Sequence, residues 1–156
     1  MEITKSDKII EIAEKELGYK ETPPNSNKTK YGEWFGFDGV AWCGMFVSWV
    51  YATALLPLGN IGFFKGFAGC QTAVKHFKET GEVTESPTSG DIVFFDWNKD
   101  GRYDHTGIFY KKLDDTYFES IEGNTSMSNQ SNGGEVMKRT RKFSSAIFVH
   151  PVILDN

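Results

Sequence analysis

The chain has 156 residues, of which 39% are hydrophobic and 15% aromatic, and it carries a formal net charge of −4. A chain of this length can build one hydrophobic core without metal or disulfide support, so we expect a single domain over residues 1–156. The composition excludes an intrinsically disordered protein, and the acidic balance excludes a nucleic-acid-binding domain with a basic face.

The N-terminus and the longest apolar stretch carry no targeting or membrane signal. Residues 1–7 lack a charged segment followed by an apolar one, so no secretory signal peptide is predicted. The stretch around residues 46–58 is too short and too aromatic to span a bilayer. We therefore expect a soluble protein that is made in the cytoplasm and acts as a monomer. Its two cysteines, Cys43 and Cys70, do not demand a disulfide scaffold.

The first half of the chain reads as helices joined by loops. Three helices are expected: one from the caps Thr4 or Ser6 to the stop signal Gly18, one from Cys43 to before Pro57, and one from about Cys70 to Thr80. Turn-forming residues mark residues 22–28 as a loop, and a glycine- and aromatic-rich loop over residues 31–40 leads to Cys43. A third loop, residues 59–69, contains three phenylalanines.

After Pro87 the pattern changes to that of strands. Strands are expected at residues 91–95, 106–110, 117–121, 136–143 and 146–153. Pro151 indicates that the last of these lies at a sheet edge. Residues 126–134 are rich in Gly, Asn and Ser and are predicted to form a mobile surface loop. Helices followed by strands predict an α+β fold, with the N-terminal helices packed on an antiparallel sheet of about five to six strands.

Cys43 has the setting of a nucleophile. It falls in the first turn of a helix with a broad apolar stripe, where unpaired N–H groups and the helix dipole stabilise a thiolate over a thiol. Taken alone, the residue also fits a small buried hydrophobe. Cys70 follows Gly69 at another predicted helix start and is a weaker rival, because it lacks the aromatic approach loop and the long buried helix.

A base and its orienting partner are predicted from two neighbouring strands. His105 opens one strand, and Glu122-Gly123-Asn124 closes the next. If the two strands form a hairpin, the start of one lies beside the end of the other. Cys43 would then attack a carbonyl carbon with His105 as general base, and either Glu122 or Asn124 would fix the imidazole tautomer.

The remaining histidines and the oxyanion donors are less distinctive. His76 lies on the polar face of the third helix and is read as a solvated residue, and His150 near the chain end is read as structural. The backbone N–H of Cys43 is the obvious oxyanion donor. The hydroxyl of Tyr31 is a candidate for the second donor.

Four motifs follow one another along the chain: Trp42-Cys43-Gly44-Met45-Phe46-Val47, Gly90-Asp91-Ile92-Val93-Phe94-Phe95, Asp104-His105-Thr106-Gly107-Ile108 and Glu122-Gly123-Asn124. In these motifs and their order, and over roughly residues 8–152, the sequence resembles a known family, the CHAP domains (cysteine- and histidine-dependent amidohydrolases/peptidases) of bacterial and phage cell-wall lytic enzymes. The resemblance implies a papain-like α+β fold, and it supports Cys43, His105, Glu122 and Asn124 as the functional set.

The resemblance also implies a substrate and a place of action. The expected activity is hydrolysis of peptidoglycan, either at the N-acetylmuramoyl-L-alanine amide or within the stem or cross-bridge peptide. We expect a phage-type lysin that reaches the wall through a membrane pore and depends on a separate wall-binding module, because the acidic domain would not be drawn to the wall by charge. Two alternatives remain: a thiol protease or acyltransferase with other substrates, and a non-catalytic calcium- or wall-binding module.

Residues 96–104 match the first nine positions of an EF-hand-type calcium loop. Oxygen donors stand at positions 1, 3, 5, 7 and 9, with glycine at position 6 for the sharp turn; they are Asp96, Asn98, Asp100, the carbonyl of Arg102, and Asp104. The glutamate usual at position 12 is replaced by Gly107, and the alternative is a solvated acidic turn. We expect a structural calcium ion that orders His105. Some CHAP domains bind calcium before the cysteine, but here that loop offers only Glu33 and Asp38.

Aromatic residues near Cys43 are candidates for the substrate groove. The expected contacts are Trp34, Phe35, Phe37 and Trp42. The alternative for any of them is packing in the core, which is the usual place of phenylalanine.

Overall fold

The computed structural model describes residues 2–155, and the predicted α+β fold is confirmed for them. The helices are α1 (Lys5–Lys15), α2 (Lys30–Phe35), α3 (Cys43–Thr53) and α4 (Cys70–Thr80). The strands are β1 (Val83–Thr84), β2 (Ile92–Phe95), β3 (His105–Lys112), β4 (Tyr117–Thr125), β5 (Glu135–Lys142) and β6 (Ala146–Val149). Two short 3₁₀ helices, η1 (Phe143–Ser145) and η2 (Val152–Leu154), flank β6.

The helix boundaries follow the predicted caps, with one helix missed. Thr4 caps α1 in a capping box with Asp7, and Gly81 ends α4 in the left-handed conformation. The predicted loop before Cys43 contains α2. The Thr29 side chain accepts a hydrogen bond from the N–H of Gly32 at 3.0 Å, and the left-handed Gly36 ends the helix. Six residues are too few for helical periodicity to stand out.

The strands form one antiparallel sheet in the order β1-β6-β2-β3-β4-β5. The prediction that Pro151 marks an edge strand is wrong, because β6 lies between β1 and β2 and ends at Val149, before the proline. The edge strands are β5 and β1. The sequence pattern did not predict β1, which has only two residues. The central pair β3 and β4 carries the hairpin that was expected to bring His105 and Glu122 together.

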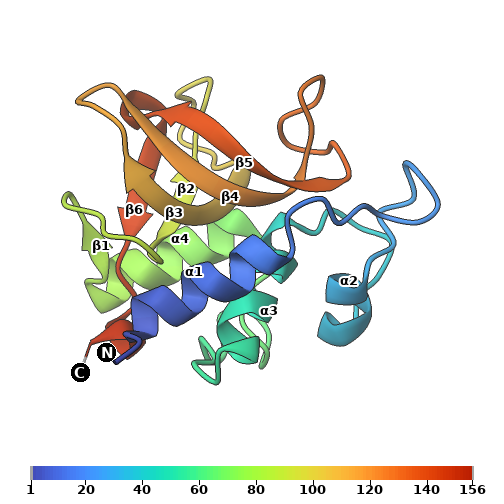
Figure 1. Cartoon of the computed structure of the whole chain (residues 1–156), viewed down its shortest axis with the longest axis horizontal. Coiled ribbons are helices and arrows are strands. Elements are labelled where there is room, and N and C mark those ends of the chain that lie inside the picture. The colour runs from blue at the N-terminus through green and yellow to red at the C-terminus, as the bar shows by residue number, and fades with distance from the viewer. Residues whose placement is uncertain (1, 156) are drawn as a thin grey trace.

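Both faces of the sheet are buried. The helices α1, α3 and α4 cover one face (Figure 1), where they pack on residues such as Ile92, Phe94, Ile108 and Ile121. The other face of the curved sheet carries a second cluster, formed by Val93, Phe95, Phe109, Phe118 and Phe148. Because side chains alternate along a strand, β3 directs Ile108 toward the helices and Phe109 toward this second cluster.

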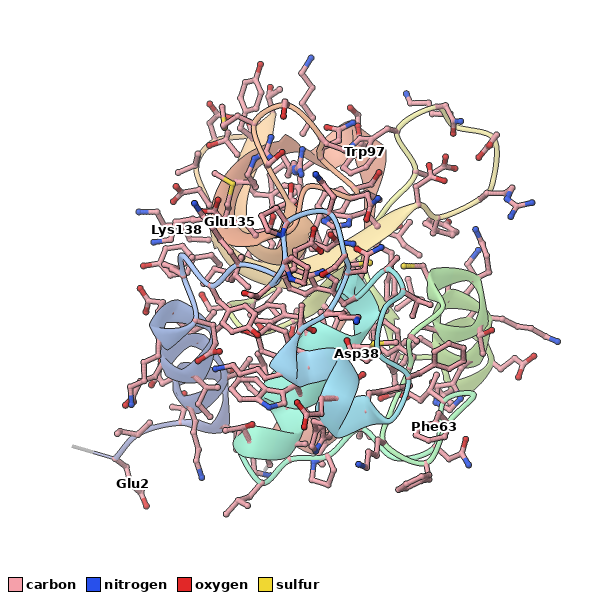
Figure 2. All side chains as sticks on the ribbon, turned by 90° about the vertical axis from the view of Figure 1, so that its right-hand side faces the viewer. Glu2, Asp38, Phe63, Trp97, Glu135 and Lys138 are labelled. Atoms are coloured by element: carbon pink, nitrogen blue, oxygen red, sulfur yellow. The ribbon has the colours of Figure 1, made fainter. Side chains whose placement is uncertain are left out.

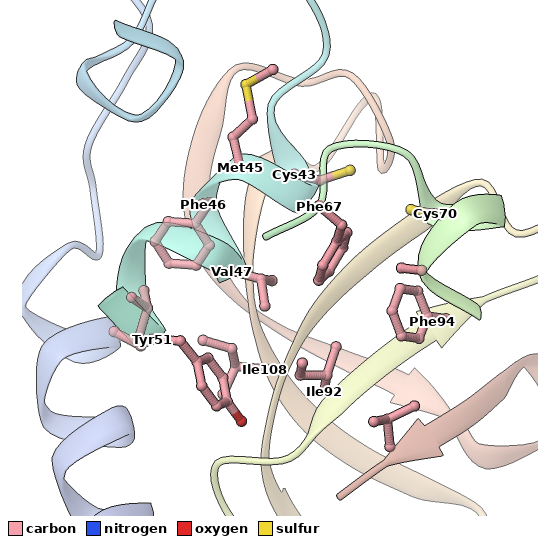
Figure 3. Close-up of a cluster of buried hydrophobic side chains, with 14 of the residues drawn as sticks. Cys43, Met45, Phe46, Val47, Tyr51, Phe67, Cys70, Ile92, Phe94 and Ile108 are labelled. Carbon is pink, nitrogen blue, oxygen red and sulfur yellow. The ribbon is translucent and has the colours of Figure 1, made fainter. Parts of the chain in front are cut away.

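Helix α3 is the most deeply buried helix and fixes the place of Cys43. Eight of its 11 residues are buried, and they pack on β3 and β4. Gly44 allows the segment before α4 to approach, since a Cβ at Gly44 would lie 2.6 Å from the carbonyl oxygen of Ala68. The N-termini of α3 and α4 therefore lie side by side, as Figure 3 shows for Cys43 and Cys70. No helix within residues 2–155 has the length and apolar character needed to cross a membrane.

Candidate active site

Cys43 is the first residue of α3, as predicted, and is 5% exposed. No side chain caps this end of the helix, so its first N–H groups are free to act on a charge placed there. The backbone N–H of Thr106, at the start of β3, faces the sulfur and helps to lower the pKa of Cys43. The Cys43 sulfur therefore lies between the N-terminus of α3 and the strand that carries His105.

The Cys70 thiol lies against Cys43 (Figure 3), and both cysteines are free. A hydrogen bond from Cys70, together with the charge of His105, lowers the pKa of Cys43 well below its usual value, although burial acts in the opposite direction. The same hydrogen bond, together with burial, raises the pKa of Cys70. Of the two thiols, Cys43 is therefore the one whose pKa is lowered and which ionises first.

His105 and Glu122 form the predicted pair and are both fully buried. Nε2 of His105 lies 2.9 Å from Oε1 of Glu122. Gly107 makes this contact possible, because a Cβ at that position would lie 2.6 Å from Cγ of Glu122. A carboxylate only accepts hydrogen bonds, so Nε2 carries a proton and donates a hydrogen bond to Glu122. The glycine that replaces an acidic residue in the calcium-loop pattern thus has a different purpose, which is to make room for Glu122.

Glu122 is held from several sides. Arg141 donates from Nε to Oε2 at 2.9 Å and from Nη2 to Oε1 at 2.5 Å, and the Ser120 hydroxyl also donates to Oε2. Burial opposes ionisation, but the hydrogen bonds from Arg141 and His105 outweigh it and lower the pKa of Glu122 to about 2. Neither Arg141 nor Ser120 was predicted as a site residue. Arg141 lies in the strand expected at residues 136–143, where it is one of several basic residues.

The second ring nitrogen of His105, Nδ1, is buried and has no hydrogen-bond partner among residues 2–155. Burial favours the neutral imidazole, but the charges of Cys43 and Glu122 outweigh it and raise the pKa of His105 to about 9. The arrangement therefore favours a thiolate and an imidazolium over two neutral groups. Nδ1 is the nitrogen left to exchange protons with a group at Cys43.

Asn124 has a different role from Glu122. Its Oδ1 accepts a hydrogen bond from the N–H of Gly134 at 3.1 Å, and its Nδ2 donates to Asn132 at 3.1 Å. The residue is buried and adopts a left-handed φ of 60°. Of the two candidates for orienting His105, Glu122 makes the contact, and Asn124 anchors the loop of residues 126–134 to the end of β4.

The hydroxyl of Tyr31 is not available as an oxyanion donor, contrary to the expectation. It donates to Oε1 of Glu16 at 2.6 Å, and the tyrosine is fully buried. The backbone N–H of Cys43 remains the oxyanion donor that the sequence suggested.

The four aromatic residues expected in the substrate groove do not share one environment. Trp42 is fully buried; it stacks on Tyr31, with ring centroids 5.5 Å apart, and donates from Nε1 to Glu21. Phe35 is also buried, so both belong to the core rather than to a substrate-facing surface. Trp34 is partly buried beneath the Lys65 ammonium, and Phe37 is 62% exposed.

The segment from Asp96 to Asp104 forms the turn that connects β2 to β3. The Asp96 carboxylate accepts hydrogen bonds from the N–H groups of Asp100 at 3.2 Å and Gly101 at 2.9 Å, and Gly101 has the left-handed φ of 83° expected at the sharp turn. Asn98 and Arg102 complete the predicted donor positions. Within residues 2–155, however, no three His, Cys, Asp or Glu side chains are gathered as a metal site would require.

The other two histidines lie away from Cys43. His150 forms ion pairs with Asp91 at 2.6 Å and with Asp155 at 2.8 Å, which link the end of the chain to the start of β2. His76 packs its ring edge-on against Phe77, with centroids 5.1 Å apart.

Comparison of the sequence with protein-family models gives a match to the family described as CHAP domain over residues 34–124, which is more than half of the chain. This span contains Cys43, His105, Glu122 and Asn124. A comparison with curated proteins finds no match to the chain. The family match suggests a cysteine- and histidine-dependent hydrolase of amide bonds.

Proposed function

Because the chain belongs to the CHAP domain family, whose members act on peptidoglycan, we propose that it hydrolyses an amide bond of peptidoglycan with Cys43 as the nucleophile. The observation that carries the proposal is the buried contact of His105 with Glu122, which leaves Nδ1 free, beside a cysteine at a helix N-terminus. This combination of an activated thiol, a base and an orienting group is what nucleophilic catalysis requires.

The proposed reaction runs through a thioester. The Cys43 thiolate attacks the carbonyl carbon, and the backbone N–H of Cys43 stabilises the oxyanion of the tetrahedral intermediate. The His105 imidazolium then gives its Nδ1 proton to the departing amine as the C–N bond breaks. The neutral imidazole next takes a proton from water, which attacks the thioester and restores the Cys43 thiolate and the imidazolium.

Two bonds remain in the proposal: the N-acetylmuramoyl-L-alanine amide, and an amide of the stem or cross-bridge peptide. Both are amides, so the proposed chemistry fits either. The further assignment to a phage-type lysin, with its separate wall-binding module, stays a prediction.

The test is a comparison of substrates. Purified protein is incubated with dye-labelled peptidoglycan and with dye-labelled casein, and the soluble dye is measured over time. The proposal expects release from peptidoglycan and little from casein. Release from casein alone would favour a thiol protease with other substrates, and binding to peptidoglycan without any release would favour a non-catalytic module.

We also propose that the turn from Asp96 to Asp104 binds calcium. The support is the spacing of its oxygen donors and the left-handed Gly101. An ion would have to draw the carboxylates of Asp96, Asp100 and Asp104 together. The segment ends next to His105, so a bound ion would order the start of β3 and take no part in the reaction itself.

A further inference from the structure

The guanidinium of Arg141 forms a buried ion pair with the carboxylate of Glu122. Arg141 lies on β5 and is 6% exposed, while Glu122 is fully buried. The two hydrogen bonds that Arg141 donates, from Nε to Oε2 and from Nη2 to Oε1, engage both carboxylate oxygens of Glu122 at once. A planar guanidinium that binds a carboxylate in this way fixes the plane of the carboxylate as well as its position.

Arg141 is itself locked in place by two loops beside the site. Its guanidinium carbon lies 4.9 Å from the ring centroid of Trp97, which belongs to the turn between β2 and β3. It also lies 5.3 Å from the ring centroid of Phe95. Its third nitrogen, Nη1, donates to Oε1 of Gln130 at 3.0 Å, in the loop of residues 126–134. Figure 2 shows Trp97 beside the strands, at the end of the molecule opposite Phe63.

The register of the sheet explains the reach of this side chain. Arg141 is paired with Phe118 on β4, and Ser120 and Glu122 follow on the same face of that strand at intervals of two residues. The arginine side chain therefore extends along the face of the sheet to reach Glu122. Arg139 is paired with Ser120 on the same face but donates to Thr125 and to the carbonyl of Ser126, and makes no hydrogen bond to Glu122.

We propose that Arg141 is a positioning residue for the hydrolysis proposed above, and the inference rests on that proposed function. Arg141 holds the Glu122 carboxylate so that Oε1 faces Nε2 of His105, and the imidazole in turn keeps Nδ1 toward Cys43. Arg141 touches neither substrate nor the reacting atoms. Its effect passes through Glu122, and this separates the proposal from a purely structural ion pair, whose loss would lower stability without depending on Glu122 for its effect on rate.

The experiment is a double-mutant cycle on soluble cross-linked muropeptides released from peptidoglycan by a muramidase. The variants are Arg141→Met, Arg141→Lys, Glu122→Gln and the double variant Arg141→Met/Glu122→Gln, with Arg139→Met as the matched control on the same strand. For each folded variant, kcat and KM are measured. The rate of Cys43 alkylation by iodoacetamide is measured separately by peptide mass spectrometry, which distinguishes Cys43 from Cys70.

We expect Arg141→Met to lower kcat about 10- to 100-fold with KM little changed, because the reacting groups are misaligned while substrate contacts remain. Arg141→Lys restores part of the loss, and Arg139→Met retains most of the activity. In the Glu122→Gln background, removal of Arg141 changes kcat by no more than about twofold, since the residue it acts through is already disabled.

Equal losses in the wild-type and Glu122→Gln backgrounds would overturn the proposal, as would a kcat for Arg141→Met within about twofold of wild type. If Arg141→Met does not fold because Glu122 stays buried without its arginine partner, Arg141→Lys takes its place in the cycle, since it keeps the charge and loses the two-point contact. Equal losses in the two backgrounds, or a kcat within about twofold of wild type, then overturn the proposal. If the wild type cleaves no muropeptide, the proposed function fails. The alkylation rate of Cys43 then tests the positioning role alone, because slower alkylation in Arg141→Met than in Arg139→Met supports it and equal rates overturn it.

Discussion

His105 donates from Nε2 to Oε1 of Glu122 at 2.9 Å, and both side chains are completely buried. This contact fixes the imidazole from behind and leaves Nδ1, which has no partner within residues 2–155, on the side of Cys43. The sheet therefore fixes in advance the orientation of the imidazole that the proposed reaction needs.

The first prediction concerns pH. The pKa of Cys43 is lowered and that of His105 is raised to about 9. The thiolate–imidazolium pair therefore exists from the pKa of Cys43 up to that of His105, and it is lost above about pH 9, when the imidazolium deprotonates. We expect hydrolysis of muropeptides to be constant around neutral pH and to fall above about pH 9. In Glu122→Gln the fall moves to lower pH, because the carboxylate raises the pKa of His105. If the fall in hydrolysis at high pH occurred at the same pH in Glu122→Gln as in the wild type, Glu122 would not be the partner that sets the pKa of His105.

The second prediction concerns Cys70. Its thiol donates to Cys43, so Cys70→Ala removes a hydrogen bond to the thiolate and raises the pKa of Cys43. The rate of Cys43 alkylation by iodoacetamide, measured from pH 4 to 9, therefore shifts to higher pH in Cys70→Ala. Hydrolysis persists at reduced rate at neutral pH. Complete loss of hydrolysis in a folded Cys70→Ala protein would instead revive Cys70 as the nucleophile.

The third prediction separates Asn124 from Glu122. Asn124→Ala removes two hydrogen bonds and places alanine at a left-handed φ, so we expect a loss of about 1–3 kcal/mol in the free energy of unfolding, measured in urea. Asn124→Gly, which tolerates that φ, loses less. Both variants keep more hydrolytic activity than Glu122→Gln. If Asn124→Ala were the more damaging to kcat at equal foldedness, Asn124 rather than Glu122 would be the orienting residue.

The fourth prediction concerns calcium. Isothermal titration of calcium into the wild-type protein gives a binding heat that Asp100→Ala lacks, because position 5 of the loop loses its carboxylate. Asp115→Ala, which removes an exposed carboxylate from the turn between β3 and β4, is the matched control and binds as the wild type does. Absence of heat from the wild type itself would remove the site and leave a solvated turn.

Much of the fold and part of the site could be predicted from local patterns. A few neighbouring residues were enough to predict the caps Thr4 and Gly81 and the helical start at Cys43. The same holds for the hairpin that brings His105 to Glu122. The helix α2 escaped prediction because it is shorter than two helical turns. The central position of β6 escaped because the order of strands depends on pairing between distant segments, which Pro151 could not reveal.

The parts of the site that were missed depend on contacts between distant residues. Arg141 reaches Glu122 only because β5 is paired with β4 in one register, and a basic residue on a strand carries no mark of its partner. The burial of Trp42 and the contact of Tyr31 with Glu16 likewise depend on how the helices pack. The composition near Cys43 suggested a groove lined by four aromatic residues, but two of them, Phe35 and Trp42, are buried in the core.

The most direct test of the central claim is mass spectrometry of the soluble fragments released from purified peptidoglycan by the wild-type protein and by Cys43→Ala, with Cys70→Ala as the matched cysteine control. We predict that the wild type and Cys70→Ala release fragments with the same new amine and carboxyl ends, which identify the amide cleaved, and that Cys43→Ala releases none. Release of the same fragments by Cys43→Ala would contradict the account.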